Sequence, residues 1–388
     1  MKDALPSTKR PQEWGRLTWI RDAIARSLAA VPSACGLQPA YHCTIVKLDH
    51  LGDFVLACRA IQRLLDHFGE TRCILVISPE AKPLAAALFP RTPLCVLPAT
   101  AVGLFREIVP RVISWRSKLR RLNCQHLVCL RHQRSLYRDL VLRWIPCEIM
   151  WRLDGSPFGD RDIIELPDAI GMYPAISGGG IWPLELLAHA RLLTSILHSP
   201  VAAVNIVPKI AHEFVQSEQT YIVVAPLAFD PIRNLDPTKV WELLAALAPL
   251  QQARVIFIGS ASQNQQLAEY VTSAPPQWKQ NCEIRTGESI RIWLQLLRNA
   301  RLTLSADSAS AHLATALDVP LVATLGGGHP GIFAPWRNSS RQQWVAHPLA
   351  CYGCDWHCPH TQPICLSQIS IPALVAAAQT AMENKPAA

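Results

Sequence analysis

Short apolar runs alternate with longer amphipathic stretches along most of this chain. In the first half, apolar runs predict strands at 44–48, 73–77, 94–97 and 126–130, and an amphipathic helix at 54–68. In the second half they predict strands at 221–225, 254–258, 282–285, 302–304 and 320–325, separated by helices at 239–247, 262–271, 290–299 and 309–317. Strands that alternate with helices indicate parallel, doubly wound sheets, so we expect an α/β fold.

The two alternations divide the chain into two Rossmann-like halves, which are expected to face one another and bind a ligand in the cleft between them. We expect a helical extension at 1–40, one domain at 41–205, a second at 206–375 and a C-terminal tail at 376–388. A Gly- and Pro-rich stretch at 145–180 is expected to lie over the mouth of the first domain, and a helix is expected at 182–197.

Composition indicates a globular protein with an anionic partner. Half of the residues are hydrophobic, and the formal net charge of +8 favours a phosphorylated ligand, an acidic membrane surface or nucleic acid. No stretch combines dense Lys and Arg with aromatic residues, so we expect no nucleic acid partner. No apolar run has the length of a bilayer span, and residues 1–11 are too polar for a signal peptide, so we expect a cytoplasmic protein.

The extension carries apolar residues at helical spacing, namely Trp14, Leu17, Ile20, Ile24 and Leu28, with arginines between them. We expect this helix to pack on the body of the protein. The alternative is a helix that lies on the membrane surface, which would place the protein at the periphery of the inner membrane.

The stretch 302–336 contains the most informative pattern. Asp307 and Ser308 follow an apolar strand and are good N-cap residues for the next helix, and Gly326, Gly327 and Gly328 directly follow the strand after it. A helix N-terminus and a glycine loop at the ends of adjacent parallel strands both suit an anion, so we predict a diphosphate site. Four residues beyond Ser308, His312 lies on the same helix face and is either a ligand or a satisfied core histidine.

Asp53 ends the loop LDHLGD between the first strand and its helix. Gly52 permits a tight turn there, and Asp53 is either the N-cap of the helix or a catalytic base. The helix N-terminus is expected to keep Asp53 ionised. Asp49 and His50 crowd the same loop, which a cap alone would not need.

Arg233 lies in the loop PLAFDPIRNLDP after the strand at 221–225. A guanidinium at the end of a parallel strand can clamp a diphosphate through two hydrogen bonds. The alternative is a solvated surface arginine.

Cys351, Cys354, Cys358 and Cys365 give the spacing C-x2-C-x3-C-x6-C, with Trp356 and His357 between them. Four thiolates at this spacing can close a tetrahedral site around zinc or iron, and we expect one structural metal ion that takes no part in chemistry. Two disulfides or four free thiols are the alternatives. The nine other cysteines are scattered and are expected to be buried free thiols.

Three stretches together resemble glycosyltransferase family 9, the heptosyltransferase family: IVKLDHLGDFVLACRAIQRL, VVAPLAFDPIRNLDPTKVWELL and LSADSASAHLATALDVPLVATLGGGHP. The resemblance covers about residues 41–375. It implies a GT-B fold, an N-terminal acceptor domain, a C-terminal domain for the nucleotide sugar, and inverting transfer of a sugar, classically from ADP-heptose, to a bacterial surface glycan or glycolipid such as the lipopolysaccharide core.

The resemblance also implies roles for residues. Asp53 matches the catalytic aspartate of the family's Gly-Asp motif, and Asp307, Ser308 and His312 match its nucleotide-sugar site. Leaving-group charge would be met by Arg233, the helix N-terminus and the glycine-loop amides, so no catalytic metal ion is required.

This chain departs from the family at three places. The family commonly has Lys at the position of Arg233 and a Gly-Pro or similar pair at Ala309 and Ser310, and an amide such as Gln263 stands in place of its nucleoside-contacting acid.

The Cys-rich tail resembles that of a subset with the pattern CxGCxWxC. Related autotransporter heptosyltransferases hold a cysteine-bound iron, so a protein acceptor is an alternative. Two further alternatives are a non-catalytic nucleotide-sugar-binding or scaffold protein of the same fold and a nucleotide-sugar epimerase.

Overall fold

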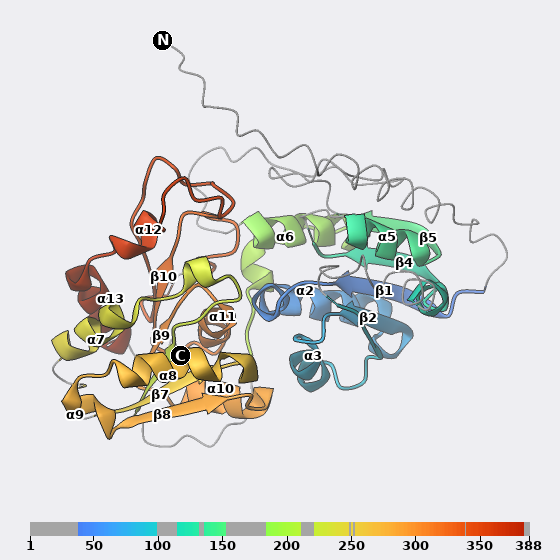
Figure 1. Ribbon diagram of the computed structural model, residues 1–388. Helices are drawn as coiled ribbons and strands as arrows, with labels where there is room; N and C mark the ends of the chain where they lie inside the picture. The colour runs from blue at the N-terminus through green and yellow to red at the C-terminus, as the bar shows by residue number, and fades with distance from the viewer. Residues whose placement is uncertain are drawn as a thin grey trace, which may run out of the picture.

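The computed structural model describes residues 38–98, 115–131, 136–152, 184–210, 221–247, 250, 253–337 and 339–383. It contains two parallel β-sheets, each covered by helices on both faces (Figure 1). The expected α/β class is therefore confirmed. The predicted extension helix and most of the Gly- and Pro-rich stretch lie outside the described residues.

The first sheet has the strand order β3-β2-β1-β4-β5. Its strands are β1 (Tyr41–Lys47), β2 (Cys73–Ile77), β3 (Leu94–Val96), β4 (Cys124–Cys129) and β5 (Cys147–Arg152). All five residues of β2 are buried, as expected for a parallel strand between two layers of helices. The helices of this domain are α2 (Leu51–Phe68), α3 (Lys82–Leu88), α5 (Leu136–Trp144) and α6 (Leu184–Leu197), with 3₁₀ turns at Glu70–Arg72 and Ala203–Ile206.

The second sheet has the order β11-β10-β9-β6-β7-β8. Its strands are β6 (Tyr221–Ala225), β7 (Arg254–Gly259), β8 (Cys282–Thr286), β9 (Leu302–Ser305), β10 (Leu321–Leu325) and β11 (Gln342–Ala346). Its helices are α7 (Pro237–Ala246), α8 (Asn264–Thr272), α9 (Pro276–Lys279), α10 (Ile290–Arg298), α11 (Ala309–Ala316), α12 (Ile364–Ser367) and α13 (Ile371–Glu383), with 3₁₀ turns at Pro231–Arg233 and Ala261–Gln263.

The two domains meet where α2 packs against α11, as Figure 1 shows between the two sheets. A single cluster of buried apolar side chains runs from α2 and α6 of the first domain to α10 and α11 of the second. In α2 it includes Phe54 and Ile61, and in α11 Ala311 and Leu313. The apolar core is therefore continuous across the domain boundary.

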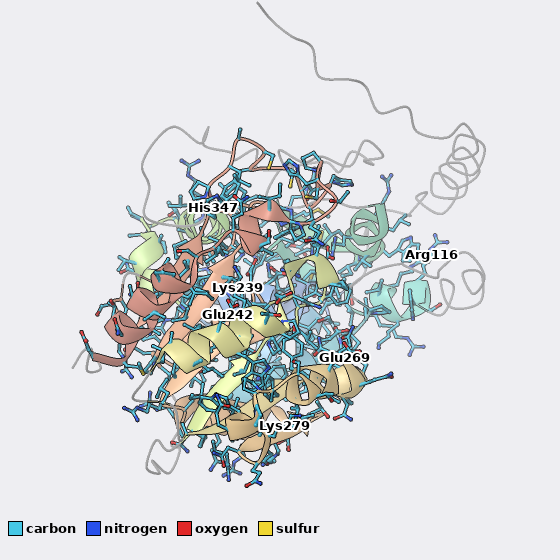
Figure 2. All side chains as sticks on the ribbon, turned by 60° about the vertical axis from the view of Figure 1, so that its left-hand side comes forward. Arg116, Lys239, Glu242, Glu269, Lys279 and His347 are labelled. Carbon is cyan, nitrogen blue, oxygen red and sulfur yellow. The ribbon has the colours of Figure 1, made fainter. Side chains whose placement is uncertain are left out.

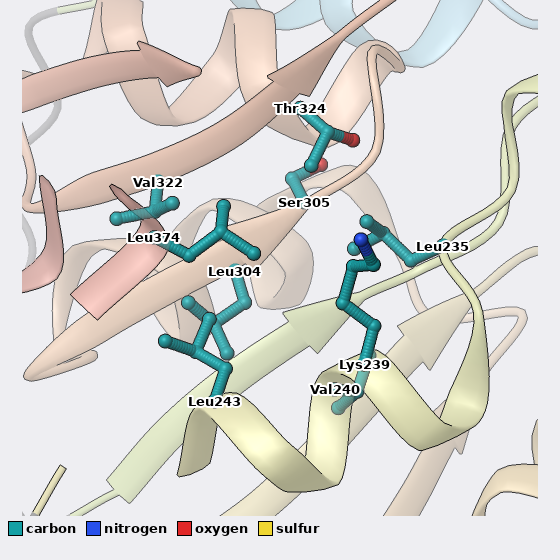
Figure 3. A pocket seen from close by; sticks show the side chains of 9 residues that line it. All are labelled: Leu235, Lys239, Val240, Leu243, Leu304, Ser305, Val322, Thr324 and Leu374. Carbon is teal, nitrogen blue, oxygen red and sulfur yellow. The ribbon is translucent and has the colours of Figure 1, made fainter. Parts of the chain in front are cut away.

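Helix α13 packs on α7, β10 and β11, so the chain beyond 375 continues a helix of the second domain. Next to it, Lys239 of α7 donates its Nζ protons to the carbonyls of Ser367 (2.8 Å) and Ile369 (2.5 Å). The Lys239 stem lines a small apolar cavity with Leu374 of α13 and Val322 of β10 (Figure 3). This contact fastens the segment after α12 to the body of the domain.

Exposed charged side chains project from the outer helices of the second domain, among them Glu242, Glu269 and Lys279 (Figure 2). Among the helices that the structure describes, none combines the length and the apolar character needed to span a bilayer.

Candidate active site

The site residues follow strands at the two points where the strand order reverses. Asp53 follows β1, which lies between β2 and β4, and Arg233 and Asp307 follow the neighbouring strands β6 and β9. In an open parallel sheet, such reversal points at the carboxyl ends of strands form the ligand crevice. The structure thus brings together Asp53, in the first turn of α2 in one domain, and the Arg233 and Asp307 loops of the other.

Asp53 lies in the first turn of α2, three residues after the N-cap His50. It is therefore not the helix cap, which was the alternative to a catalytic role. Burial raises the pKa of Asp53 to about 6; Lys47 and Arg233 oppose this shift, while Glu185 and Asp307 add to it. The expectation that the helix N-terminus keeps Asp53 ionised holds only above this pH, because desolvation outweighs the helix dipole.

A buried ionic network lies behind Asp53. Lys47, at the end of β1, donates to Glu185 Oε1 at 2.6 Å and to the Leu130 carbonyl at 3.1 Å, and its Nζ lies 3.0 Å from Asp49 Oδ2. Arg131 pairs with the other oxygen of Asp49. Each of Lys47, Asp49 and Glu185 is about 1% exposed, so the network is structural and Asp49 is not open to a substrate.

His50 reaches across to the second domain. Its ring lies 4.1 Å, centroid to centroid, from the ring of Phe229, which is 73% exposed in the loop after β6. Burial lowers the pKa of His50. His50 therefore packs as a neutral ring at the edge of the cleft.

Arg233 and Asp307 form a loose pair, with Nη1 of Arg233 3.7 Å from Oδ2 of Asp307. The Arg233 side chain is 21% exposed, and its Nε is buried without a hydrogen-bond partner among the described residues. Arg233 is thus not the solvated surface arginine that was the alternative to a phosphate ligand. Its geometry leaves donors free to bind an anion.

His312 lies at the contact between the domains. Trp336 donates its indole N–H to His312 Nδ1 at 2.9 Å, so the neutral ring carries its proton on Nε2, 3.8 Å from Asp307 Oδ1. Burial lowers the pKa of His312 to about 4; Asp307 opposes this shift and Arg233 adds to it. His312 is therefore a neutral, oriented ring beside Asp307.

Gly52 gives α2 its close approach to α11. A Cβ at position 52 would lie 2.9 Å from Cδ2 of His312 and 3.6 Å from Cα of Ala309. The role predicted for this glycine, a tight turn, is wrong, because Gly52 lies inside α2. Its missing side chain lets the first turns of α2 and α11 touch.

Ser308 is the N-cap residue of α11, but its side chain does not cap the helix. Its hydroxyl lies 3.2 Å from the hydroxyl of Ser305 at the end of β9. Ala309 begins the helix beside Gly52. The N-terminus of α11 therefore lies at the interface between the two domains, against the first turn of α2.

The glycine loop after β10 is covered by the Cys-rich segment. A Cβ at Gly326 or Gly328 would overlap the ring of Trp356, and one at Gly327 would overlap Tyr352. The Gly327 N–H donates to Cys365 Sγ at 3.4 Å. These glycines therefore admit two aromatic rings, and the amide of Gly327 is already bonded within the protein.

The four tail cysteines, Cys351, Cys354, Cys358 and Cys365, lie in the described part of the chain. Burial raises the pKa of Cys354, and the thiols of Cys358 and Cys351 add to this shift. Within the described ranges, no three His, Cys, Asp or Glu side chains are placed to hold a metal ion. The arrangement of the sulfurs does not show the predicted metal site.

Gln263 has a structural role. Its side chain accepts the Ser260 N–H at 2.9 Å, as part of a capping box at the turn that follows β7. The amide that stands where the family has an acid is thus bonded to its own loop.

Sequence reasoning gave no role to Lys47, Glu185 or Trp336, and it noted Trp356 only as a residue between the tail cysteines. A usable signal existed for two of them, because Lys47 ends an apolar strand and Glu185 interrupts an apolar helix. A charged residue in such a position needs a buried partner. The partner of each lies more than a hundred residues away, which the sequence does not reveal.

Two Rossmann-like domains that face one another across their carboxyl edges define the GT-B class of fold. Residues 205–355 match the model of glycosyltransferase family 9 (heptosyltransferase), which confirms the resemblance seen in the motifs. No curated protein matches the sequence.

Solved structures of this kind cover nearly the whole chain. A glycosyltransferase of family 9 from Veillonella parvula is 13% identical, with a TM-score of 0.62 over 89% of this chain and 98% of that one. E. coli heptosyltransferase WaaC with ADP-2-deoxy-2-fluoro heptose is 15% identical, with a TM-score of 0.58 over 86% and 97%. E. coli ADP-heptose lps heptosyltransferase II is 17% identical, with a TM-score of 0.57 over 88% and 98%. The chain therefore has a heptosyltransferase-like fold.

Proposed function

We propose that this protein is an inverting glycosyltransferase that moves a heptose-like sugar from a nucleotide-diphosphate sugar to a bacterial surface glycan such as the lipopolysaccharide core. One observation carries the proposal. A half-buried carboxylate, Asp53, lies at the reversal point of one sheet, and the charges of Arg233 and Asp307, at the reversal point of the other sheet, shift its pKa. A base and an anion-binding arginine that meet from two domains suit transfer between two bound substrates.

Asp53 is the proposed catalytic base. It takes the proton of the acceptor hydroxyl as that oxygen bonds to the anomeric carbon, and the diphosphate leaves from the opposite face with the electrons of the broken bond. A pKa of about 6 leaves Asp53 mostly ionised at neutral pH and close enough to that pH to act as a base. Transfer is therefore expected to fall as the pH is lowered through about 6.

Arg233 is the proposed partner of the leaving diphosphate. Its buried Nε has no hydrogen-bond partner among the described residues, and the 3.7 Å pair with Asp307 leaves room for a stronger anion. The N-terminus of α11, at Ser308 and Ala309, adds the positive end of a helix dipole. Nε2–H of His312 and the backbone amides of the glycine loop at Gly326 and Gly328 complete the proposed set of donors.

The donor and acceptor are proposed from the family. WaaC was solved with an analogue of ADP-heptose, so ADP-heptose or a similar nucleotide sugar is the first donor to test. The proposed acceptor is a glycan or glycolipid, reached by a cytoplasmic enzyme at the periphery of the inner membrane. A protein acceptor is the alternative that the Cys-rich tail favours.

The test begins with nucleotide sugars screened for an increase in melting temperature, since a ligand that binds the native state stabilises it. The best donor is then incubated with acceptors, and transfer is measured by mass spectrometry of the product. We expect Asp53→Asn to abolish transfer while the donor affinity stays within about threefold of the wild-type value, because the amide keeps the shape but cannot accept the proton.

Near-normal turnover by Asp53→Asn would contradict the role of Asp53. Donor binding without transfer to any glycan, glycolipid or protein acceptor would favour the scaffold function. Epimerised donor in the absence of acceptor would favour an epimerase.

A further inference from the structure

The segment 351–358, here called the Cys segment, forms a wall on the glycine loop. The Gly353 N–H donates to the Gly327 carbonyl at 2.7 Å, and the Asp355 N–H donates to the Gly328 carbonyl at 3.1 Å. The rings of Tyr352 and Trp356 occupy the space that any side chain at Gly326, Gly327 or Gly328 would need. The segment is therefore packed against the end of β10 rather than being a separate appendage.

The backbone is strained at the tip of this segment. Asp355 and Trp356 have φ values of 49° and 58°, in the left-handed region that non-glycine residues rarely adopt. Two successive residues of this kind persist only where surrounding contacts fix them, and such strain is concentrated at functional sites. Here the strained pair sets the position of the Trp356 ring.

Polar contacts also fix the plane of that ring. Trp356 donates its indole N–H to Nδ1 of His329 at 3.2 Å. Nε2 of His329 bonds to the Asp355 carboxylate. Because Nδ1 of His329 is the acceptor, its Nε2 carries the proton and donates it to Asp355. Two hydrogen bonds therefore join Trp356, His329 and Asp355.

Trp356 presents its ring to Arg233. The guanidinium carbon of Arg233 lies 5.9 Å from the ring centroid, within the range of a cation–π contact. In the described part of the chain, Arg233 forms one ion pair, the 3.7 Å contact with Asp307. Within the described residues, the indole of Trp356 and the carboxylate of Asp307 are therefore the two side chains that hold the arginine head group.

We propose that Trp356 is a positioning residue, which holds the guanidinium of Arg233 in the orientation that binds the diphosphate of the donor. This inference rests on the proposed function, since it takes Arg233 to be a diphosphate ligand. It makes the Cys segment part of the donor site, in contrast to the purely structural role expected from the sequence. An aromatic face restricts the guanidinium without competing for its hydrogen-bond donors, which remain free for the phosphates.

The test measures binding of inorganic pyrophosphate by isothermal titration calorimetry at fixed ionic strength. Pyrophosphate lacks base and sugar, so it reports the diphosphate contacts alone. The proteins are wild type, Arg233→Ala, Trp356→Leu, Trp356→Phe and the double variant Arg233→Ala/Trp356→Leu. Trp293→Leu removes another half-buried indole, from α10, and serves as the matched control. Melting temperatures and circular dichroism show which variants are folded.

We expect Arg233→Ala to weaken pyrophosphate binding about 10- to 100-fold and Trp356→Leu to weaken it about five- to tenfold. Trp356→Phe should recover most of the loss, because it retains an aromatic face, and Trp293→Leu should bind as wild type does. In the double variant, the loss should equal that of Arg233→Ala alone.

Three results would overturn the inference alone: wild-type affinity in Trp356→Leu, additive losses in the double variant, or no recovery in Trp356→Phe. In each of these cases a loss in Arg233→Ala still supports the proposed diphosphate site. Unchanged affinity in Arg233→Ala would overturn that site, and with it the inference.

Discussion

Glycines in this chain are explained by what occupies the space beside them. At Gly52 that neighbour is His312 of the other domain, and at Gly326 and Gly328 it is the ring of Trp356. None of the three has a positive φ among the backbone angles recorded for the described residues. The sequence shows that small residues are needed at these positions, but the reason lies in side chains that are distant in sequence.

Asp53 gives a prediction for stability that does not depend on knowing the substrate. Its pKa rises from 3.8 to about 6 on folding, so the native state binds the proton more tightly than the unfolded state between these values. The contribution of Asp53 to stability should therefore fall as the pH rises from about 4 to 6 and then level off, and the difference between wild type and Asp53→Asn isolates it from the other titrating groups. At pH 7.5, Asp53→Asn should be more stable than wild type by about 2–3 kcal/mol, and below pH 4 the two should be equal.

Urea unfolding at a series of pH values measures this difference. Asp66→Asn is the matched control, because Asp66 is exposed on the same helix and accepts a hydrogen bond from the Gln62 amide. It should stay within about 0.5 kcal/mol of wild type at every pH. A variant at position 53 that is less stable than wild type at pH 7.5 would show that Asp53 is not desolvated.

At the scale of elements, apolar runs predict the central strands but not every edge. β5 and β11, which end the two sheets, were missed. Their sequences, CEIMWR and QQWVA, mix polar with apolar residues, and several of their side chains are half-buried or exposed. An edge strand is covered less completely, so it lacks the continuous apolar run that reveals a central parallel strand.

Helix α7 illustrates a boundary that local chemistry does fix. Asp236 accepts the N–H groups of Thr238 and Lys239, and Pro237 occupies the first helical position.

Helix α13 illustrates a boundary that was misplaced. The predicted domain boundary at 375 falls within α13, since an Ala-rich helix gave no clear start in the sequence.

The metal site predicted for Cys351, Cys354, Cys358 and Cys365 has its own, independent test. Their spacing predicts one zinc or iron ion, whereas no three of the described side chains are yet placed to hold one. We expect elemental analysis of protein purified without chelator to give about one metal per chain, and Cys354→Ser to lower metal content and melting temperature together. Cys282→Ser, on β8, is the control and should retain the metal.

Wild-type protein that contains no metal, and whose melting temperature equals that of Cys354→Ser, would refute the site. Metal that can be removed with no change in melting temperature would refute its structural role.

At the scale of the whole molecule, the continuous core predicts how the protein unfolds. One apolar cluster includes α2 and α6 of the first domain and α10 and α11 of the second, so unfolding either domain would expose the buried face of the other. Scanning calorimetry should give a single transition, with calorimetric and van't Hoff enthalpies in a ratio near one. Two separated transitions would show that the domains are independent.

The same continuity marks the limit of sequence reasoning about the site. Asp53, Arg233 and Asp307 were predicted to be site residues because each follows a strand, and the fold places all three at reversal points of the strand order. The close packing of α2 on α11, and the indoles of Trp336 and Trp356 that fix His312 and Arg233, depend on tertiary contacts. No local pattern encodes them.

Helix α6 contacts both domains and so couples their positions. The N–H groups of Leu184 and Glu185 in its first turn donate to the carbonyls of Gly331 and Ile332, just beyond the glycine loop, while the rest of the helix packs on α2. A rotation of the second domain must therefore either break these two hydrogen bonds or move the start of α6 with the second domain. In the latter case Glu185 moves relative to Lys47, and the helix acts as a lever that carries a motion at the glycine loop to the charges that surround Asp53.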